Sequence, residues 1–348
     1  MNCQPTMPTE TWPTFSPQTT AEEVADTFAS ILEGKNALIT GTSLNGMGYE
    51  AARVIAKHAR LVIITGYNED RLQLFRLKRS AEEIKKSVPT ANIRCLTLDL
   101  SSQSSVREAA AQVNSYSEPL HVLIHNAAAL NLDADTVFKR TVDLDVDVQW
   151  ATNHFGPFLL TKLLLPQLLA ATSSSWTSRV VHVSAKGHQF GTGVDLENLG
   201  RPDPTAEGNS AMGINFSTKS ANIMTASELS RRAGGRIHAY SLHPGIVYSN
   251  AFTRPKEKKS LPPELTAIGL IDENGDPVPG KFAWKSIEEG SATMVAAAFD
   301  PRLDSTPGAY LEDCQVAMTE VAPHTADPVK AAKLWDLTEE IIGEKFEF

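Results

Sequence analysis

A regular alternation of short apolar runs with helical patterns constrains the fold of this chain more than any other feature. The apolar runs are 36–40, 61–65, 93–98, 121–124, 179–183 and 237–242. The helical patterns between them are 49–58, 69–86, 104–114, 145–169 and 217–232. Because the runs are apolar throughout rather than at every second residue, both faces of the strands should be covered. The pattern predicts an α/β fold with a doubly wound parallel sheet in a single domain.

Composition narrows the class of protein further. The 348 residues include 32 basic and 41 acidic ones, which gives a net charge of −9 at pH 7. A protein that tracks nucleic-acid phosphates is usually basic, so we expect no nucleic-acid partner. No apolar run reaches the length of a membrane span, and Cys3, Cys95 and Cys314 are too scattered for a metal cage. We therefore expect a cytoplasmic protein with no membrane span and no metal site.

The chain divides into a leader and one domain. Residues 1–19 are rich in Pro and Thr and lack the basic start and apolar stretch of a signal peptide, so we expect a flexible leader. Residues 20–348 form the single domain. Within it, 190–213 and 254–280 carry Gly, Pro, Asp and Asn and follow strand ends, where open α/β sheets bind ligands. These segments are candidate substrate lids or plain surface loops.

A glycine-rich turn follows the first apolar run. The sequence TGTSLNGMG places Gly41, Gly46 and Gly48 between that strand and the next helix, with Met47 among them. Such glycines allow a tight turn, close approach of the backbone to a pyrophosphate, and close packing of helix on strand. The N-terminus of the helix supplies free N–H groups and a positive dipole for the phosphates. The turn therefore predicts a dinucleotide site of the Rossmann type.

With this loop the chain resembles the short-chain dehydrogenase/reductase family, whose usual TGxxxGxG has one residue fewer between the first two glycines. The spacing is similar to that of a retinol-dehydrogenase-like subgroup common in fungal metabolism. The resemblance implies that Asp99 of LDL bonds the adenine and that Asn126 of HNAA lies near the cofactor ribose. It also implies that Val247 and Ser249, which follow the motif HPG, contact the nicotinamide.

The stretch after the second strand bears on the choice of cofactor. NAD-binding folds usually carry Asp or Glu there to bind the ribose hydroxyls, whereas this chain has Gly66, Tyr67 and Asn68. The absence of an acid favours NADP(H), and NAD stays open as the alternative. Arg60 and Arg71 are the candidates for a contact with the 2′-phosphate.

The resemblance further implies a catalytic set of asparagine, serine, tyrosine and lysine. Asn153 matches the asparagine, and Lys219 matches the lysine that lowers the pKa of a tyrosine one helical turn earlier. That tyrosine position holds Asn215, which cannot titrate near neutral pH. The serine position at the end of the fifth strand holds Ala185. The neighbouring Ser184 should point to the opposite face, and it is a catalytic candidate only if the loop shifts.

Another side chain could supply the missing proton. Lys186 and His188 are the nearest titratable groups in sequence, and His188 is the better candidate for a substitute acid. His188 also matches a histidine common in the subgroup, so a purely structural role in the loop is the alternative.

Three functions stay open. The first is an NADP(H)-dependent oxidoreductase that acts on a small organic molecule through a site that departs from the family's pattern. The second is an NADP-binding scaffold that catalyses isomerisation, dehydration or cyclisation, and the third is a binding homologue without catalysis. We favour the first because the cofactor positions are retained. The subgroup resemblance implies a role in secondary-metabolite biosynthesis and leaves homo-oligomerisation open.

Overall fold

The computed structural model describes residues 12–67, 71–130, 138–206, 209–250, 252–253, 261 and 263–348, with the backbone alone for 71–75 and 263–264. Within these residues, eight strands form one sheet in the order β10-β9-β6-β5-β4-β1-β2-β3. The strands are β1 (Asn36–Ile39), β2 (Leu61–Gly66), β3 (Ile93–Thr97), β4 (Val122–His125), β5 (Ser178–Val183), β6 (Ile237–His243), β9 (Tyr310–Glu312) and β10 (Gln315–Val316).

The strand order is that of a doubly wound sheet. From β1 the chain moves outward through β2 to β3, then returns to β4 on the other side of β1 and continues through β5 and β6. Within this sheet β10 pairs antiparallel with β9, and the other pairs are parallel. In open α/β sheets ligands bind at the carboxyl ends of the strands where the strand order reverses, which in this sheet is between β1 and β4. The predicted α/β fold with a doubly wound parallel sheet is confirmed.

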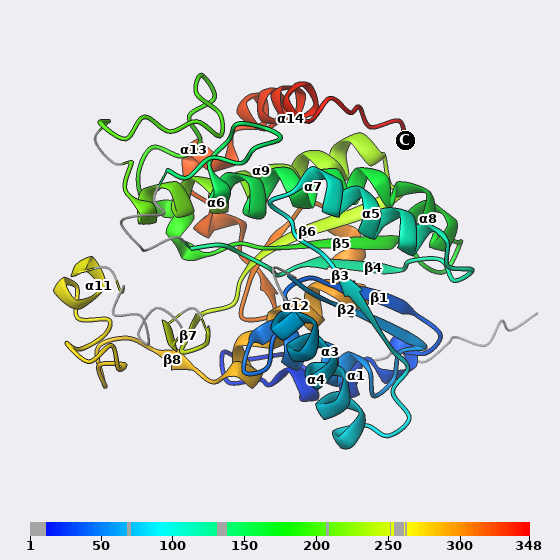
Figure 1. The fold of residues 1–348 in the computed structure, drawn as a ribbon. Helices are drawn as coiled ribbons and strands as arrows, with labels where there is room; N and C mark the ends of the chain where they lie inside the picture. The colour runs from blue at the N-terminus through cyan, green and yellow to red at the C-terminus, as the bar shows by residue number, and fades with distance from the viewer. Residues whose placement is uncertain are drawn as a thin grey trace, which may run out of the picture.

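Helices cover both faces of the sheet (Figure 1). One face is covered by α1 (Ala21–Thr27), α2 (Ala29–Leu32), α3 (Met47–Ile55), α4 (Arg71–Ser87) and α12 (Ile287–Phe299). The other is covered by α5 (Gln103–Asn114), α6 (Val148–Trp150), α7 (Gly156–Leu163), α8 (Leu165–Ala171), α9 (Ala211–Ala233) and α14 (Pro328–Ile342). Short helices at the edges are η2 (Lys186–Gln189), α11 (Pro263–Ala267), η3 (Pro301–Ser305), η4 (Met318–Glu320) and α13 (Pro323–Ala326).

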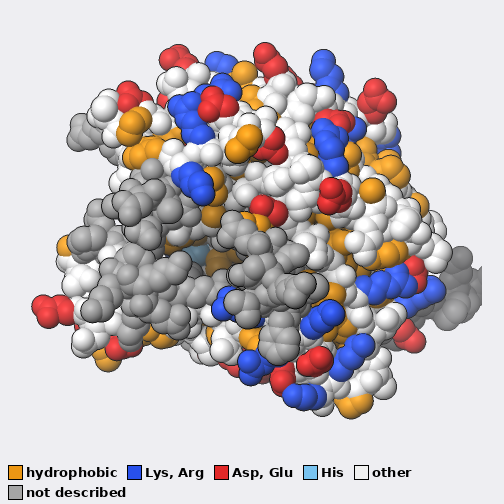
Figure 2. Space-filling view, viewed as in Figure 1, with side chains coloured by type: hydrophobic (Ala, Val, Ile, Leu, Met, Phe, Trp, Pro, Cys, Tyr) orange, Lys and Arg blue, Asp and Glu red, His pale blue; other side chains and the backbone are white. Residues whose placement is uncertain are grey.

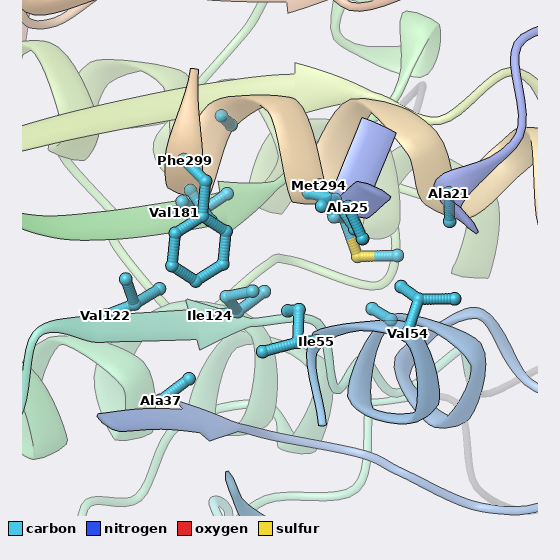
Figure 3. Close-up of a cluster of buried hydrophobic side chains, with 14 of the residues drawn as sticks. Ala21, Ala25, Ala37, Val54, Ile55, Val122, Ile124, Val181, Met294 and Phe299 are labelled. Carbon is cyan, nitrogen blue, oxygen red and sulfur yellow. The ribbon is translucent and has the colours of Figure 1, made fainter. Parts of the chain in front are cut away.

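Alternate residues of each strand supply two separate cores. Ala37 and Ile39 of β1 pack on the α3 and α12 side, whereas Leu38 packs on the α5 and α7 side. This follows from the pleat, which turns successive side chains to opposite faces. Figure 3 shows the first core, in which strand side chains meet α3 and α12 through Val122, Ile124, Val181, Val54, Ile55, Met294 and Phe299.

Two of the predicted helices differ in their bounds. The expected helix at 145–169 is divided into α6, a π-helical turn (Ala151–Phe155), α7 and α8. Pro157 and Pro166 explain the division, because a proline has no N–H to continue the helical hydrogen bonds. The expected helix at 217–232 is extended at its N-terminus by six residues in α9, which begins at Ala211.

Residues 12–19 pack against the domain, which differs from the flexible leader expected for residues 1–19. Trp12 and Phe15 pack edge-on against Phe28 of the first helical pair, with ring centroids 5.1 and 5.8 Å apart. Thr20 then starts α1 with a capping box that it shares with Glu23. Residues 1–11 lie outside the described residues.

The two candidate lids meet in a small apolar cluster beside the sheet. Leu265, Leu270 and Ile271 form its buried part, and Met212 of the first turn of α9 packs against it. The strands β7 (Ile246–Val247) and β8 (Trp284–Lys285) pair in parallel next to the cluster. Parts of both segments lie outside the described residues, and their action as lids stays a prediction.

Candidate active site

The glycine turn between β1 and α3 has no space for side chains. Gly41 adopts a φ of +72°, and a Cβ there would lie 2.8 Å from Cα of Ala127. At Gly48 a Cβ would lie 2.3 Å from Nδ2 of Asn126 and 2.6 Å from the carbonyl oxygen of Gly41. The backbone of the turn is therefore bare, as close approach of a ligand requires.

The helix α3 begins at the end of this turn. Gly46 is its N-cap and supplies no side-chain hydrogen bond to the free backbone N–H groups, and Met47 is its first residue. Nδ2 of Asn250 donates to the carbonyl oxygen of Leu44 at 2.7 Å, which ties the turn to the segment after β7. Uncapped N–H groups at a helix N-terminus bind phosphates well. The turn therefore fits the pyrophosphate of a dinucleotide.

Hydrogen bonds to the residues directly after β4 hold the glycine turn in place. Oγ1 of Thr40 accepts from the backbone N–H groups of Asn126 and Ala127, both at 3.0 Å. Nδ2 of Asn126 donates to the carbonyl oxygens of Thr40 and Gly41 at 2.9 and 3.0 Å. The N–H of Gly41 donates to Oγ1 of Thr65 at 3.2 Å. Thr40 and Thr65 thus shape the site, although the glycine pattern alone does not reveal them; their signal is a threonine that ends an apolar run.

The adenine side is only partly defined. Oδ1 of Asp99 accepts from the N–H and the hydroxyl of Ser101 at 2.8 and 2.7 Å. Tyr67 follows β2 and is 40% exposed. Arg60 precedes β2 and lies at the end of the strand opposite the glycine turn, so its candidacy for the 2′-phosphate is withdrawn. The side chain of Arg71 and the whole of Asn68 lie outside the described residues.

The segment after β6 is buried against α12. Val247 of β7 and Ser249 are 5% and 8% exposed. A Cβ at Gly290 would lie 2.3 Å from Cγ2 of Val247, so α12 approaches β7 closely. Oγ of Ser291 donates to the carbonyl oxygen of Met47 at 3.1 Å. One helix thus joins the start of α3 to the segment expected to contact the nicotinamide.

Lys219 lies at the carboxyl end of β5. Its Nζ donates to the carbonyl oxygen of Val183 at 3.0 Å, and the residue is 7% exposed. Burial lowers the pKa of the ammonium group from 10.5 to about 8. The cause is the loss of hydration, which disfavours the charged form.

Two asparagines meet at the end of the adjacent strand. Nδ2 of Asn215, one helical turn before Lys219, donates to the carbonyl oxygen of Ala129 at 3.5 Å. Asn153, in the π-helical turn, accepts from the N–H of Ala129 at 2.7 Å and donates to its carbonyl oxygen at 3.0 Å. Nδ2 of Asn153 also donates to Oγ1 of Thr218 at 3.1 Å. Asn153 and Asn215 thus share one partner, Ala129, which lies four residues after β4, while Lys219 bonds the last residue of β5.

Two residues proposed for catalysis from sequence lie outside this group. Oγ of Ser184 donates to the carbonyl oxygen of Lys219 at 2.7 Å, so it points into the packing between β5 and α9. His188 is fully buried, with Nδ1 2.8 Å from the carbonyl oxygen of Ala185 and Nε2 3.2 Å from that of Glu320. Enclosed in this way, His188 shapes the turn after β5, and the expectation that it acts as a substitute acid is withdrawn.

Figure 2 shows a histidine and apolar side chains at the surface between the α6 and β7 regions of Figure 1. Lys186, the other titratable candidate, is paired with Glu312 at 3.1 Å and Glu320 at 3.4 Å. Its charge is therefore balanced by carboxylates, in contrast to that of Lys219.

Buried histidines lie on the strands next to Lys219. The rings of His125 on β4 and His182 on β5 have centroids 4.8 Å apart. Both ring nitrogens of His182 are buried without a hydrogen-bond partner in the described part of the chain. Burial and the charge of Lys219 lower the pKa of His182 to about 3, and burial with the charge of His182 lowers that of His154 to about 3. The apolar runs alone gave no sign of this cluster.

A doubly wound sheet whose switch point carries a bare glycine turn at a helix N-terminus defines a dinucleotide-binding α/β protein. Comparison with known proteins narrows this class. The family described as short chain dehydrogenase matches residues 35–193. Short-chain dehydrogenase TIC 32 A, chloroplastic, from Brassica napus is 32% identical over 334 residues, which is 94% of each chain. Short-chain dehydrogenase/reductase prx1 from Penicillium roqueforti is 32% identical and covers 88% of this chain and 84% of its own.

The chain therefore belongs to the short-chain dehydrogenase/reductase family, as its motifs predict. Solved structures agree on the fold. An uncharacterised protein from Mycobacterium paratuberculosis is similar with a TM-score of 0.63 at 25% identity, over 92% of this chain and 98% of its own. The NADPH-bound carbonyl reductase from chicken fatty liver has a TM-score of 0.55 at 18% identity, over 82% and 99%.

Membership of this family supports a nicotinamide cofactor, and the glycine turn fits one. None of the described helices is long and apolar enough to cross a membrane. In the described part of the chain, no three His, Cys, Asp or Glu side chains are grouped so that they could hold a metal ion.

Proposed function

We propose that this protein is an NADP(H)-dependent oxidoreductase that acts on a small organic molecule through a site without the family's tyrosine. The observation that carries the proposal is the placement of Asn215 and Lys219, one turn apart on α9, beside Ala129 after β4 and Val183 at the end of β5, with Asn153 bonded to the same Ala129. Burying an ammonium group costs stability. Its retention here supports a role for Lys219 in the cofactor and substrate site.

Different residues of the chain would bind the different parts of the cofactor. The glycine turn and the first N–H groups of α3 would hold the pyrophosphate, and Asp99 would hold the adenine. Val247, Ser249 and Lys219 would hold the nicotinamide end, and Asn126 keeps the turn in shape. When bound, the nicotinamide supplies or accepts a hydride.

The choice of NADP(H) rests on the residues that follow β2. Gly66, the last residue of β2, and Tyr67 after it offer no carboxylate for the ribose hydroxyls that distinguish NAD. A carboxylate at these two positions would repel the extra phosphate of NADP, so its absence there favours that cofactor. Glu69 and Asp70 lie outside the described residues. Arg71 at the start of α4 is the remaining candidate for a contact with this phosphate.

The substrate would bind between the first turn of α9 and the β7–β8 segment. Met212 and Trp284 pack on the same apolar cluster there. An apolar wall with a few amide donors suits a small organic molecule. A role in secondary metabolism and a cytoplasmic location are further parts of the proposal; they rest on the subgroup resemblance and on composition.

Hydride transfer can be tested without knowledge of the natural substrate. Phenanthrenequinone is a suitable probe because its adjacent carbonyls accept hydride readily. The protein with NADPH should lose the near-ultraviolet absorbance of the reduced nicotinamide, mole for mole with hydroquinone formed. Gly48→Ala, whose turn would be distorted, serves as the control and should be slower. NADPH that is bound but not consumed with any carbonyl in a panel would overturn the redox proposal.

Asn215 favours one alternative function. Because the position one turn before Lys219 holds a group that does not titrate, the cofactor could serve as a fixed scaffold for isomerisation, dehydration or cyclisation. Such a site would exchange deuterium for protons next to the carbonyl of a cyclic ketone while NADP is unchanged. Nuclear magnetic resonance of the ketone distinguishes this exchange from reduction.

A further inference from the structure

We propose that Lys219 itself exchanges a proton with the substrate oxygen, while Asn215 holds that oxygen by a hydrogen bond. The inference rests on the proposed function, because it assigns the acid–base group of the same reaction. It gives the lysine a direct role in place of its indirect role beside a tyrosine.

The placement of the two nitrogens supports this division. Asn215 and Lys219 are four residues apart on α9, so their side chains lie on one face. Nζ of Lys219 is held at the end of β5 by Val183, and Nδ2 of Asn215 at the end of β4 by Ala129. Ala129 follows β4 by four residues and Val183 ends β5, and β4 and β5 pair directly in parallel, so both donors lie beyond the same edge of the sheet. The 3.5 Å contact of Asn215 is long, so its amide can turn to a substrate oxygen.

Other acids near Lys219 are excluded by their contacts. The hydroxyl of Ser184 is bonded to the backbone of α9, and the ring of His188 is enclosed by two carbonyl oxygens. The histidines on the elements packed against α9 are His154, His182, His188, His238, His243 and His324. Of the charged groups on the neighbouring β5 and η2, Arg179 pairs with Asp304, and Lys186 pairs with Glu312 and Glu320. Burial is the first cause that lowers the pKa of His154, His182 and His243, to about 3, 3 and 4, so these rings are neutral at pH 7. His324 bonds the carbonyl oxygen of His188 at 2.9 Å.

The environment of Lys219 suits an acid near neutral pH. Burial is the one cause resolved for its lowered pKa of about 8, and no carboxylate contributes to it. An acid is most effective when its pKa lies near the working pH, because it then holds a proton and releases it readily. Nζ has three N–H bonds, and its contact with Val183 uses one of them.

The proton balance of a reduction is complete with this assignment. The carbonyl carbon of the substrate gains a hydride from the reduced nicotinamide, and the electron pair of the C=O bond moves to oxygen. That oxygen takes a proton from Nζ, which becomes a neutral amine, and the cofactor is left oxidised. Solvent then returns a proton to the amine. In an oxidation the neutral amine removes the proton of the alcohol, and each step is reversed.

The first test measures Lys219 without any reaction. Competitive acetylation of the whole protein across pH, followed by peptide mass spectrometry, gives the titration midpoint of each lysine. Lys219 should titrate near pH 8, well below the ordinary lysine pKa of 10.5. Lys186, exposed and paired with Glu312, is the internal reference and should not share this midpoint. A midpoint of Lys219 near 10 would overturn the inference whatever the protein catalyses.

The second test follows turnover with NADPH and phenanthrenequinone. In the wild type the reduction rate should fall as pH rises through about 8, and the reverse oxidation should rise. Lys219→Arg keeps a charge that does not titrate there, so it should lose about 10²–10⁴-fold in rate and lose the pH dependence. Lys186→Met is the matched control and should behave as the wild type. Thermal unfolding of the Lys219→Met variant establishes whether the protein still folds with an uncharged side chain at this site.

The outcomes separate the two proposals. A wild type that consumes NADPH, together with a Lys219→Arg variant that keeps its rate or pH profile, contradicts the role of Lys219 alone. A wild type with a midpoint near 8 that transfers no hydride to any carbonyl overturns the oxidoreductase proposal, and the acid–base role with it.

Discussion

The two halves of the sheet depart from the family's pattern to different degrees. On the β1–β4 side, the glycine turn has the contacts that its residue types demand: Gly41 and Gly48 leave no space for a Cβ, and Asn126 bonds the turn. On the β5–α9 side, we propose that Lys219 is the family's lysine, that Asn215 stands at its tyrosine position and that Ala185 stands at its serine position. The fold and the cofactor cradle are thus separable from the chemistry that the site performs.

This difference has a physical basis. A glycine turn is fixed by steric limits that any dinucleotide imposes, so few residue types are compatible with it. The acid and the oxygen-binding group must match one substrate, and other groups can replace them if the oxygen is held and a proton is available. We therefore expect that a change in side-chain size has a strong effect on the β1–β4 side. On the β5–α9 side we expect a strong effect from a change in the functional group of a side chain.

The largest effect is expected when the family's tyrosine and serine are introduced on the β5–α9 side. Asn215→Tyr with Ala185→Ser should raise reduction of an ordinary aromatic ketone by about 10²–10⁴-fold over either single variant. Asn215→Tyr alone should gain little, because Ala185 has no hydroxyl to hold the ketone oxygen. Initial rates with NADPH measure this effect. Robust ketone reduction by Asn215→Tyr alone would show that the serine position does not limit the site.

A smaller effect is expected from adding one methyl group in the first half. Gly48→Ala would place a Cβ 2.3 Å from Nδ2 of Asn126, so the turn must shift. Overpacking of this kind costs about 1–3 kcal/mol. If the whole cost falls on the conformation that binds the cofactor, the affinity for NADPH falls roughly 5- to 200-fold. Gly234→Ala is the control for a general loss of stability: its φ of +57° strains an alanine although its Cβ meets nothing within 4 Å, and it lies at the far end of α9 from Ala211. Equal affinities of the two variants would remove the glycine turn from the cofactor site.

The smallest effect concerns the β5–α9 side and is expected on the free energy of unfolding at acid pH. The pKa of His182 is lowered from 6.5 to about 3 by burial and by the charge of Lys219. The unfolded chain therefore takes up a proton below pH 6.5 that the folded ring cannot, so the free energy of unfolding falls as pH falls. At about pH 5 this ring alone costs about 2 kcal/mol.

Chemical denaturation at several pH values measures that cost. His182→Phe keeps a ring but removes the titrating group, so its stability should fall less steeply between pH 6.5 and pH 5 than that of the wild type. Parallel curves for the two proteins would mean that His182 is not held neutral by the fold.

Much of the fold followed from the sequence because apolar runs and glycines report it locally. Each run from 36–40 to 237–242 became a strand, since an uninterrupted apolar run requires cover on both faces. The break of the 145–169 helix was missed because the π-helical turn at Asn153 depends on how Pro157 is accommodated in the packed helix. The packing of residues 12–19 was missed because two aromatic anchors, Trp12 and Phe15, carry no periodicity.

The candidate site followed from the sequence only in part. Motif positions indicated Asn153, Asn215 and Lys219, and the structure places the first two against Ala129 and the third against the last residue of β5. His188 was misjudged because distance along the chain does not show that a ring is enclosed by backbone carbonyls from η2 and from the turn at Glu320. The low pKa of Lys219 arises from burial between β5 and α9, which is a property of tertiary packing.

Binding of NADPH and NADH to the wild-type protein tests the central claim most directly. Quenching of intrinsic tryptophan fluorescence, or titration calorimetry, gives both dissociation constants without any substrate. We predict that NADPH binds with a dissociation constant below about 1 mM and NADH about tenfold more weakly or worse. Binding of neither dinucleotide at millimolar concentration would contradict the account, because the bare turn at Gly41 and the buried Lys219 would then hold no cofactor.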